Sequence, residues 1–346
     1  MYFYPKPNNS DYFNPICINN KLHSMGDSLY PYLQMKIHSS LCFNNINTIK
    51  IVGEFDRDSI ISDNEKGNKI FNYMRPSLLI EGEQAFLKCF PGIDYVFHFS
   101  SIIKSYSDII QSNVKVECTL PDEYVCWNEV CKSSIKDIPV VDTVIMGYVE
   151  GLEYLSEDKK WSGTGNFLYK RIKTKSGEAL LIGCKHTYWG DIAGRIVLYL
   201  ASLGVKRVIY SGKLGTLNDF YVPNETIATG NCSCLPNNRI IYWDNLFENA
   251  ESPIVKKGKH ITIPSVLQEN KKWVSSEKKK YSFVDPEIGH MAYAAQKANI
   301  KFSYLHIISD NLSKKYMFDL SNERKQKVLL SRKRLMQLIG KMILDV

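Results

Sequence analysis

The sequence predicts an α/β protein in which residues 139–346 form a mostly parallel β-sheet flanked by helices. Two observations predict this fold class. Beyond residue 139, strand-like and helix-like patterns alternate along the chain, as they do when helices connect parallel strands. Several strand-like segments are short, continuous apolar runs, which is typical of strands buried on both faces. The expected strands are residues 143–146, 179–183, 207–210, 225–228, 260–263 and 302–308.

Three helices complete this region. Residues 192–203 place apolar side chains on one face, and the helix is expected to end at Gly204. A second helix is expected to start with Asp285 as its N-cap and Pro286 as its first helical residue. The third is a long C-terminal helix over residues 322–344.

The N-terminal part of the chain has a different character. Residues 1–35 are rich in Asn, Pro and Tyr and are expected to form an extended arm. Residues 36–138 are expected to form an additional α+β domain. No motif in this domain points to a chemistry, so its role stays open. Its expected elements are strands at 46–55, 95–100 and 114–119 and a helix at 102–110.

Composition sets limits on function. The chain of 346 residues is 44% hydrophobic, which is enough for a full core. It has no apolar run near the roughly 18 residues of a membrane span and no secretory signal pattern, so we expect a cytoplasmic protein without membrane contact. Nine cysteines without paired spacing predict reduced thiols, and neither a metal site nor a cofactor is expected.

The charge balance mildly favours anionic partners. Lys and Arg number 44 against 36 Asp and Glu, for a net charge of +8. Lysines gather in residues 256–280, where a solvated loop is the favoured interpretation. Nucleic-acid binding through this stretch is a minority hypothesis, and we expect no nucleic-acid partner.

Two carboxylates stand where ligand chemistry is expected. Asp310 directly follows the strand 302–308, at the carboxyl end where open α/β sheets bind ligands, although an Asx turn or helix cap explains it equally well. Glu287 lies in the first turn of its helix, where the macrodipole favours a carboxylate regardless of function. As an acceptor, a carboxylate takes hydrogen bonds from both hydroxyls of a ribose diol.

Three loops offer further candidates. Gly212 and Lys213 follow the strand 207–210 and are expected to form a turn whose N–H groups converge on an anion; an ordinary tight turn is the alternative. Glu150 follows the first strand and could orient a water as a general base, or be a plain surface glutamate. Lys185 and His186 are candidate cations, although a lone histidine is usually structural.

Taken in order, these segments resemble the nucleoside phosphorylase superfamily over roughly residues 141–345. This superfamily includes purine nucleoside phosphorylases, uridine phosphorylases and methylthioadenosine nucleosidases. The order and spacing of the segments carry the resemblance better than any one of them. They are residues 144–151, 180–183, 204–218, 284–287 and 307–310.

The resemblance implies a mixed, twisted central sheet, a homo-oligomer and two site roles. Glu287, after Pro286, would bind the ribose hydroxyls. Asp310, beside Ser309, would act on the base, where protonation of N7 makes a better leaving group. Pyrimidine-specific members differ at this position, so the resemblance implies a purine nucleoside or nucleotide as the ligand.

The sequence departs from the family at positions where phosphorolytic members bind phosphate. Phosphorolytic members have one arginine where this chain has Leu152 or Glu153, and a second arginine where it has Tyr210. Lys213 stands where they have a serine. Either Lys213, Lys185 and His186 form another site for orthophosphate, or water attacks instead. We therefore expect cleavage of the N-glycosidic bond of a purine nucleoside or nucleotide, with hydrolysis favoured over phosphorolysis. The alternative is a non-catalytic nucleoside-binding sensor.

Overall fold

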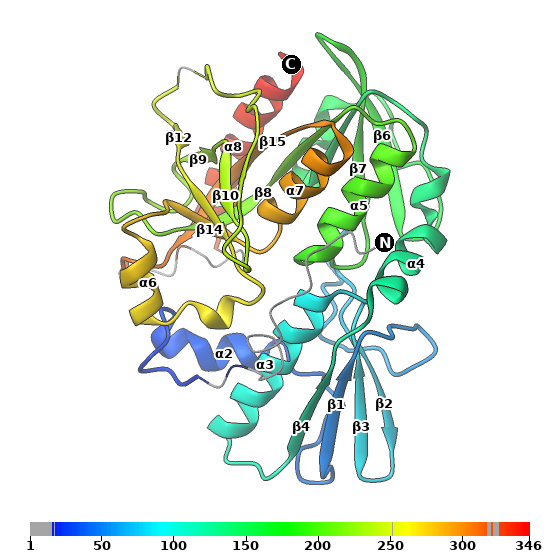
Figure 1. The fold of residues 1–346 in the computed structure, drawn as a ribbon, viewed down its shortest axis with the longest axis vertical. Coiled ribbons are helices and arrows are strands. Elements are labelled where there is room, and N and C mark those ends of the chain that lie inside the picture. Colours follow the sequence, from blue (N-terminus) through cyan, green and yellow to red (C-terminus); the bar gives the residue numbers. More distant parts are fainter. Residues whose placement is uncertain (1–15, 17, 251, 317–319, 321–324) are drawn as a thin grey trace. The chain divides into compact units, whose positions relative to one another are not determined.

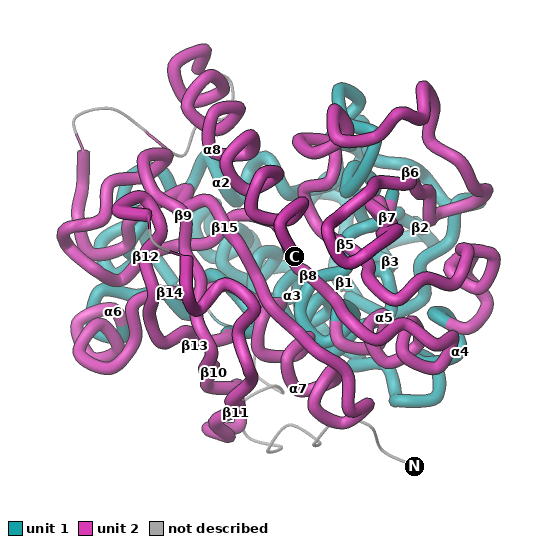
Figure 2. Tube along the Cα trace, turned by 90° about the horizontal axis from the view of Figure 1, so that it is seen from above, with its two compact units in different colours: residues 1–130, 185–193, 263–273 teal, residues 131–184, 194–262, 274–346 magenta. Residues whose placement is uncertain are grey.

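The computed structural model describes residue 16 and residues 18–250, 252–316, 320 and 325–346. The chain folds into two compact units (Figure 2). Unit 1 comprises residues 1–130, 185–193 and 263–273, and unit 2 comprises residues 131–184, 194–262 and 274–346. The domain limits expected from the sequence differ from these units mainly by the two later segments that join unit 1. Those limits stay a prediction.

Unit 1 contains a four-stranded sheet in the order β2-β3-β1-β4 (Figure 1). Strand β1 is parallel to both β3 and β4, and β2 is antiparallel to β3. Helix α3 packs against β1 and β4, and α2 packs against α3. The elements are α2 Leu29–Gln34, β1 Thr48–Val52, β2 Ser77–Glu81, β3 Gln84–Lys88, α3 Ile93–Ile109 and β4 Lys115–Thr119, with α4 Glu123–Lys132 following at the edge of the unit.

Helix α3 corrects one expectation. The strand predicted at 95–100 is wrong, because these residues form part of this single long helix. Nearly the whole segment is buried, and an apolar run that is buried on all sides carries no period that separates strand from helix. A residue far along the sequence caps the start of α3: the Asp191 carboxylate accepts the N–H groups of Ile93 at 3.0 Å and Asp94 at 3.1 Å. Within the expected N-terminal arm, residues 29–34 form α2.

Unit 2 is built on an eleven-stranded mixed sheet, and the predicted α/β class is confirmed. Strand β8 is the junction of this sheet: it pairs in parallel with β5 and β15, and its end pairs with β14 in antiparallel. The strands are β5 Thr143–Gly147, β6 Phe167–Thr174, β7 Gly177–Cys184, β8 Arg207–Thr216, β9 Ile227–Thr229, β10 Cys232–Cys234, β11 Ile240–Tyr242, β12 Val255–Lys257, β13 His260–Thr262, β14 Phe283–Asp285 and β15 Lys301–Asn311.

Helices cover this sheet on both sides (Figures 1 and 2). Helix α7 packs on β10, β13 and β15, and α8 packs on β6 and β15 from the other side. The predicted C-terminal helix is present from Gln326, while residues 321–324 lie outside the described part of the chain. The helices are α5 Asp191–Ser202, α6 Lys271–Glu277, α7 Ile288–Ala298 and α8 Gln326–Leu344; the first turn of α5 and the first residues of α6 belong to unit 1. Short 3₁₀ helices lie at Gly26–Ser28, Ser134–Asp137, Val149–Leu155 and Val266–Gln268.

Candidate functional site

Strand β8 forms the centre of the candidate site and corrects the predicted glycine turn. Gly212 and Lys213 lie within β8, which pairs with β15 from Arg207 to Thr216. Gly212 marks a close approach: a Cβ there would lie 2.8 Å from Nε2 of His306. Glycine within a strand commonly serves such an approach, which explains why Gly212 and Gly215 both lie within β8 and do not turn the chain.

The segment before α7 places Glu287 at the helix N-terminus. Asp285 ends strand β14, and its Oδ1 accepts the N–H groups of Glu287 at 3.0 Å and Ile288 at 2.9 Å. The helix begins at Ile288 with Glu287 as its N-cap, so the expectation that Pro286 opens the helix is wrong. Asp285 still performs the capping chemistry, and it thereby fixes the backbone of Glu287.

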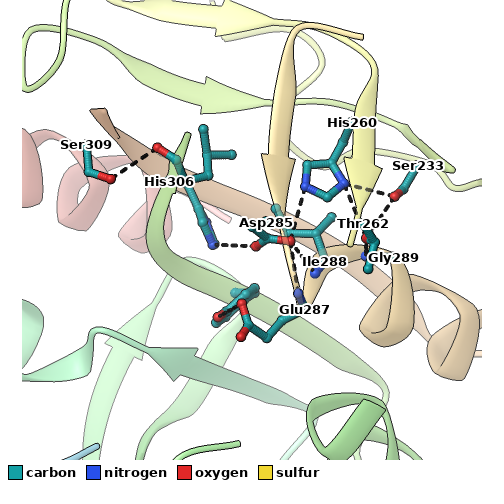
Figure 3. A network of polar contacts seen from close by, with 11 residues as sticks. Ser233, His260, Thr262, Asp285, Glu287, Ile288, Gly289, His306 and Ser309 are labelled. Atoms are coloured by element: carbon teal, nitrogen blue, oxygen red, sulfur yellow. Dashed lines mark hydrogen bonds and ion pairs between the residues drawn. The ribbon is translucent and has the colours of Figure 1, made fainter. Parts of the chain in front are cut away.

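The side chain of Glu287 is held from the opposite direction. The Tyr210 hydroxyl, on β8, donates to Oε2 of Glu287 at 3.3 Å. The Tyr210 ring packs edge-on against His306, with 4.5 Å between ring centroids. His306 in turn faces Oδ2 of Asp285 at 3.7 Å, as Figure 3 shows. These four residues form a closed ring of contacts that restrains both the backbone and the carboxylate of Glu287.

A buried polar network lies behind this ring (Figure 3). His260 Nε2 is 3.1 Å from Oδ1 of Asp285, and His260 Nδ1 is 2.9 Å from the hydroxyl of Ser233. Thr262 accepts the N–H of Gly289 at 2.8 Å, so the network also holds the first turn of α7. Ser233, His260 and Asp285 resemble a hydrolase triad in composition, but all three are buried, and their contacts stabilise Asp285.

The charges of this network follow from its burial. Burial raises the pKa of Asp285, but the imidazoles of His260 and His306 and the Ile288 N–H outweigh this, so the pKa lies below its ordinary value. Burial lowers the pKa of His306 to about 4, against the opposing effect of Asp285. At neutral pH, Asp285 is therefore a carboxylate and His306 is a neutral imidazole.

Asp310 lies at the end of β15, where the sequence placed it. A register shift between Ile308 and Asp310 sets Asp310 opposite Gly215 of β8. The hydroxyl of Ser309 donates to Oδ1 of Asp310 at 2.6 Å, and a Cβ on Gly215 would lie 3.0 Å from the other carboxylate oxygen. A short hydrogen bond to one oxygen and a glycine beneath the other fix the orientation of this carboxylate.

The remaining candidates of unit 2 gather around Tyr148, at the end of β5. The Tyr148 N–H donates to the carbonyl of Ser211 on β8 at 2.6 Å. The ammonium of Lys213 lies 5.7 Å from the centre of the Tyr148 ring. Burial raises the pKa of Tyr148, the Glu150 carboxylate raises it further, and the Arg332 guanidinium lowers it. The side chains of Glu150 and Arg332 therefore lie near this ring. Glu150 and Lys213 thus both lie near the Tyr148 ring.

Lys185 and His186 belong to unit 1. The carbonyl of Lys185 accepts the N–H of Tyr73 at 3.0 Å, and the His186 ring stacks on Phe90 with 3.6 Å between centroids. Burial lowers the pKa of His186 to about 3. This pKa favours a neutral imidazole at physiological pH and does not favour the expected cation role of His186, which stays a prediction.

Sequence reasoning missed the residues that support Glu287. The sequence marked Tyr210 only as a position where the chain differs from the family. Its hydrogen bond to Glu287 joins residues 77 positions apart, so no local pattern predicts it. His260 and His306 are single histidines within strands, and no local pattern marks them. Among the described residues, no group of three or more His, Cys, Asp or Glu is arranged to hold a metal ion. No described helix is long and apolar enough to cross a membrane.

Comparison with solved structures identifies the fold. Uridine phosphorylase from Vibrio fischeri superposes with a TM-score of 0.50 at 10% identity, covering 62% of this chain and 93% of that protein. Purine nucleoside phosphorylase from Toxoplasma gondii gives 0.46 at 14% identity, covering 61% and 92%. The 5′-methylthioadenosine/S-adenosylhomocysteine nucleosidase of Campylobacter jejuni gives 0.45 at 17% identity, covering 58% and 97%. The predicted resemblance to the nucleoside phosphorylase superfamily is confirmed at the level of the fold.

Sequence comparison adds one distant relative. The oxidoreductase cns1 of Cordyceps militaris is 26% identical over 257 residues, which are 66% of this chain and 32% of that protein. The chain therefore spans about a third of the length of this curated relative, whose name describes the longer protein. No model of a known protein family matches the sequence.

Proposed function

We propose that unit 2 binds a purine nucleoside or nucleotide and cleaves its N-glycosidic bond. The observation that carries this proposal is the ring of contacts that fixes Glu287, with Tyr210 on its carboxylate and Asp285 on its backbone. A preorganised, acceptor-only carboxylate suits a ribose diol, because it takes one hydrogen bond from each hydroxyl without reorganising.

Asp310 supplies the chemistry at the base. Its carboxyl group stands at the carboxyl end of a central strand and is oriented by Ser309. A carboxyl group that donates a proton or hydrogen bond to purine N7 stabilises the departing base as the sugar gains oxocarbenium character. General acid catalysis of this kind typically contributes a factor of about 10²–10⁴ in rate.

Water is the favoured nucleophile. The resemblance places an arginine of phosphorolytic relatives at Tyr210, which here has a neutral hydroxyl that donates to Glu287. The other arginine position corresponds to Leu152, which is buried, or Glu153, which carries a negative charge. Glu150, at the end of β5, is the candidate that would orient the attacking water.

The test is release of free purine from a panel of nucleosides, 5′-monophosphates and 5′-thioethers, followed by chromatography with and without orthophosphate. We expect release that does not depend on phosphate and is lost in Asp310→Asn and Glu287→Ala. Binding measured by calorimetry without any base release would favour the non-catalytic alternative. Neither binding nor release across the panel would overturn the proposal.

A further inference from the structure

A large apolar side chain of unit 2 stands in water on a loop that is itself held in place. The Phe220 ring is 88% exposed, more than any other large apolar side chain among the described residues. The Phe220 N–H donates to Oδ1 of Asn218 at 2.9 Å, and the Asn311 amide donates to the carbonyls of Asn218 and Tyr221, both at 2.9 Å. Phe220 gains no burial from the fold, so its surroundings decide whether it serves a partner.

The loop of Phe220 is tied to strand β15 beside the candidate base site. Asn311, which makes two of these hydrogen bonds, directly follows Asp310 in β15. The Ser313 hydroxyl adds another bond to the loop, to the Leu217 carbonyl at 2.7 Å. The exposed ring is thus carried by a loop that adjoins the site proposed for a purine nucleoside.

Lysines contact both neighbours of Phe220 in the sequence. The Lys278 ammonium lies 3.1 Å from Oδ2 of Asp219. The Lys256 ammonium lies 5.9 Å from the centre of the Tyr221 ring. One lysine follows α6 and the other lies in β12, so the fold brings two cations from different segments to the residues that flank the exposed ring.

Further contacts extend this surface. The Tyr316 hydroxyl donates to the Tyr221 carbonyl at 3.3 Å, and the ammonium of Lys314 lies 5.7 Å from the centre of the Tyr316 ring. The two residues after Lys278 are also exposed lysines. All of these residues belong to unit 2. We call the set the Phe220 surface: Phe220, Tyr221, Tyr316, Lys256, Lys278, Lys279, Lys280 and Lys314.

The Phe220 surface carries more positive than negative charge. Two of its lysines are paired, Lys278 with Asp219 at 3.1 Å and Lys280 with Glu277 at 3.5 Å. The other three have no carboxylate within 4.0 Å among the described residues. Glu225, later in the same loop, is exposed and offsets part of this charge. The excess favours an anionic partner and opposes a second copy of this chain, whose own lysines would face these.

We propose that the Phe220 surface binds single-stranded nucleic acid, with a base stacked on the Phe220 ring and the phosphates beside the lysines. Proteins bind single strands by exposed aromatic rings among cations, because every base offers a flat face and every linkage a negative charge. A duplex keeps these faces inside its stack. An anionic membrane would attract the same lysines, but Phe220 is the one strongly exposed apolar side chain of this set, and a single ring anchors a membrane weakly.

This inference revises the sequence-based expectation of no nucleic-acid partner. The lysines of residues 256–280 suggest a solvated loop, because the sequence shows neither the exposure of Phe220 nor the contacts of its neighbours with Lys256 and Lys278. Binding at this surface is independent of catalysis in unit 2. One consequence rests on the proposed function: a bound strand lies beside that site and is a source of purine nucleotides for it.

Fluorescence anisotropy of the full chain tests the surface. The probes are labelled single-stranded DNA and RNA of about 10 nucleotides, measured at a series of salt concentrations. Phe220→Ala should weaken binding about fivefold or more, the effect typical of losing one stacked base. The triple variant Lys256→Gln, Lys279→Gln, Lys314→Gln should lower the slope of log affinity against log salt by about 2, at about 0.7 per lysine on a single strand.

Matched controls lie elsewhere on the protein. Tyr124→Ala removes an aromatic ring of α4 that is 75% exposed, and Lys173→Gln removes an exposed lysine of β6. Neither substitution should change the affinity or its salt dependence.

The outcomes separate the possible partners. The absence of saturable binding of any single strand would overturn the inference, and so would parental affinity in a Phe220→Ala variant whose melting temperature matches the parent. Equal affinity for duplex and single strand would reduce the surface to general charge attraction and exclude stacking. Stronger association with vesicles that contain phosphatidylserine than with oligonucleotides would assign the surface to a membrane instead. Base release from free nucleosides is measured separately, so failure of either experiment leaves the other proposal standing.

Discussion

Removing one hydroxyl, in Tyr210→Phe, tests the support of Glu287. The Tyr210 hydroxyl donates to Oε2 at 3.3 Å, while its ring packs on His306 independently of the oxygen. Hydrogen bonds to charged groups contribute about 1.5–3 kcal/mol, and 3.3 Å is long for such a bond, so the lower end applies. About 1.4 kcal/mol corresponds to a tenfold change, so ligand affinity and kcat/KM should each fall about tenfold.

Two measurements check this expectation. Calorimetry with a purine nucleoside reports binding even if turnover is slow, and base release followed by chromatography reports kcat/KM. The matched control is Tyr304→Phe. Tyr304 also packs on His306, but its buried hydroxyl has no hydrogen-bond partner within the described residues. Its removal should leave both measurements unchanged and should not lower stability.

The refuting result is specific. If Tyr210→Phe binds and cleaves nucleosides within twofold of the parent while Glu287→Gln loses activity, then Glu287 acts without support from Tyr210. An equal loss in Tyr304→Phe would instead show that disturbance of His306, and not the lost hydroxyl, causes the effect.

Four further perturbations address the same network. Asp285→Ala should lower the free energy of unfolding by about 3 kcal/mol, measured by urea denaturation, because two N–H groups lose their cap and a buried network loses its charge; a loss under about 1 kcal/mol would contradict this role. Ser309→Ala should reduce base release about tenfold at unchanged stability, since Asp310 loses its 2.6 Å hydrogen bond; a parental rate would count against it. Gly212→Ala should cost about 1–3 kcal/mol, because the new methyl lies 2.8 Å from the buried His306 ring; an unchanged melting temperature would show that the strand yields freely. Stability should rise from about pH 4 to about 6.5, because His306 has a pKa of about 4 when folded and about 6.5 when unfolded, so the unfolded chain binds the extra proton; in His306→Gln about 3 kcal/mol of this rise should disappear, and an unaltered pH profile would exclude this origin.

The sequence predicted those parts of unit 2 whose signals are local. Strands β5, β7 and β15 are short apolar runs with polar borders, and they appear at the expected residues. Asp310 and Glu287 became candidates because Asp310 follows a predicted strand and Glu287 lies in the first turn of a predicted helix; their roles stay predictions. The predicted turn at Gly212 failed because the requirement for glycine comes from His306, 94 positions away in the sequence, and no local pattern shows it.

Contacts between distant segments account for the other failures. Residues 185–193 and 263–273 join unit 1, although they lie within the stretch that resembles the phosphorylase fold. Nothing in the order of residues shows that Asp191 caps α3 across 98 positions or that His98 approaches Ser265. The sequence alone therefore left the N-terminal part without a role, because the contacts that assemble unit 1 join segments far apart in the chain.

Under the proposed function, the charges near Glu287 are the reason that we favour water over phosphate as the nucleophile in unit 2. An orthophosphate nucleophile would approach the sugar that, as we propose, is bound by Glu287. Two like charges about 5 Å apart oppose each other by about 3 kcal/mol at an effective dielectric constant of about 20. An arginine offsets this repulsion with a full charge, whereas Tyr210 offers a neutral hydroxyl that already donates to Glu287. A neutral water meets no such repulsion and needs only a base to orient it, the role that we propose for Glu150 in the 3₁₀ helix after β5. In the proposed function, Tyr210 therefore supplies no cation for phosphate and also holds Glu287, and both effects favour hydrolysis.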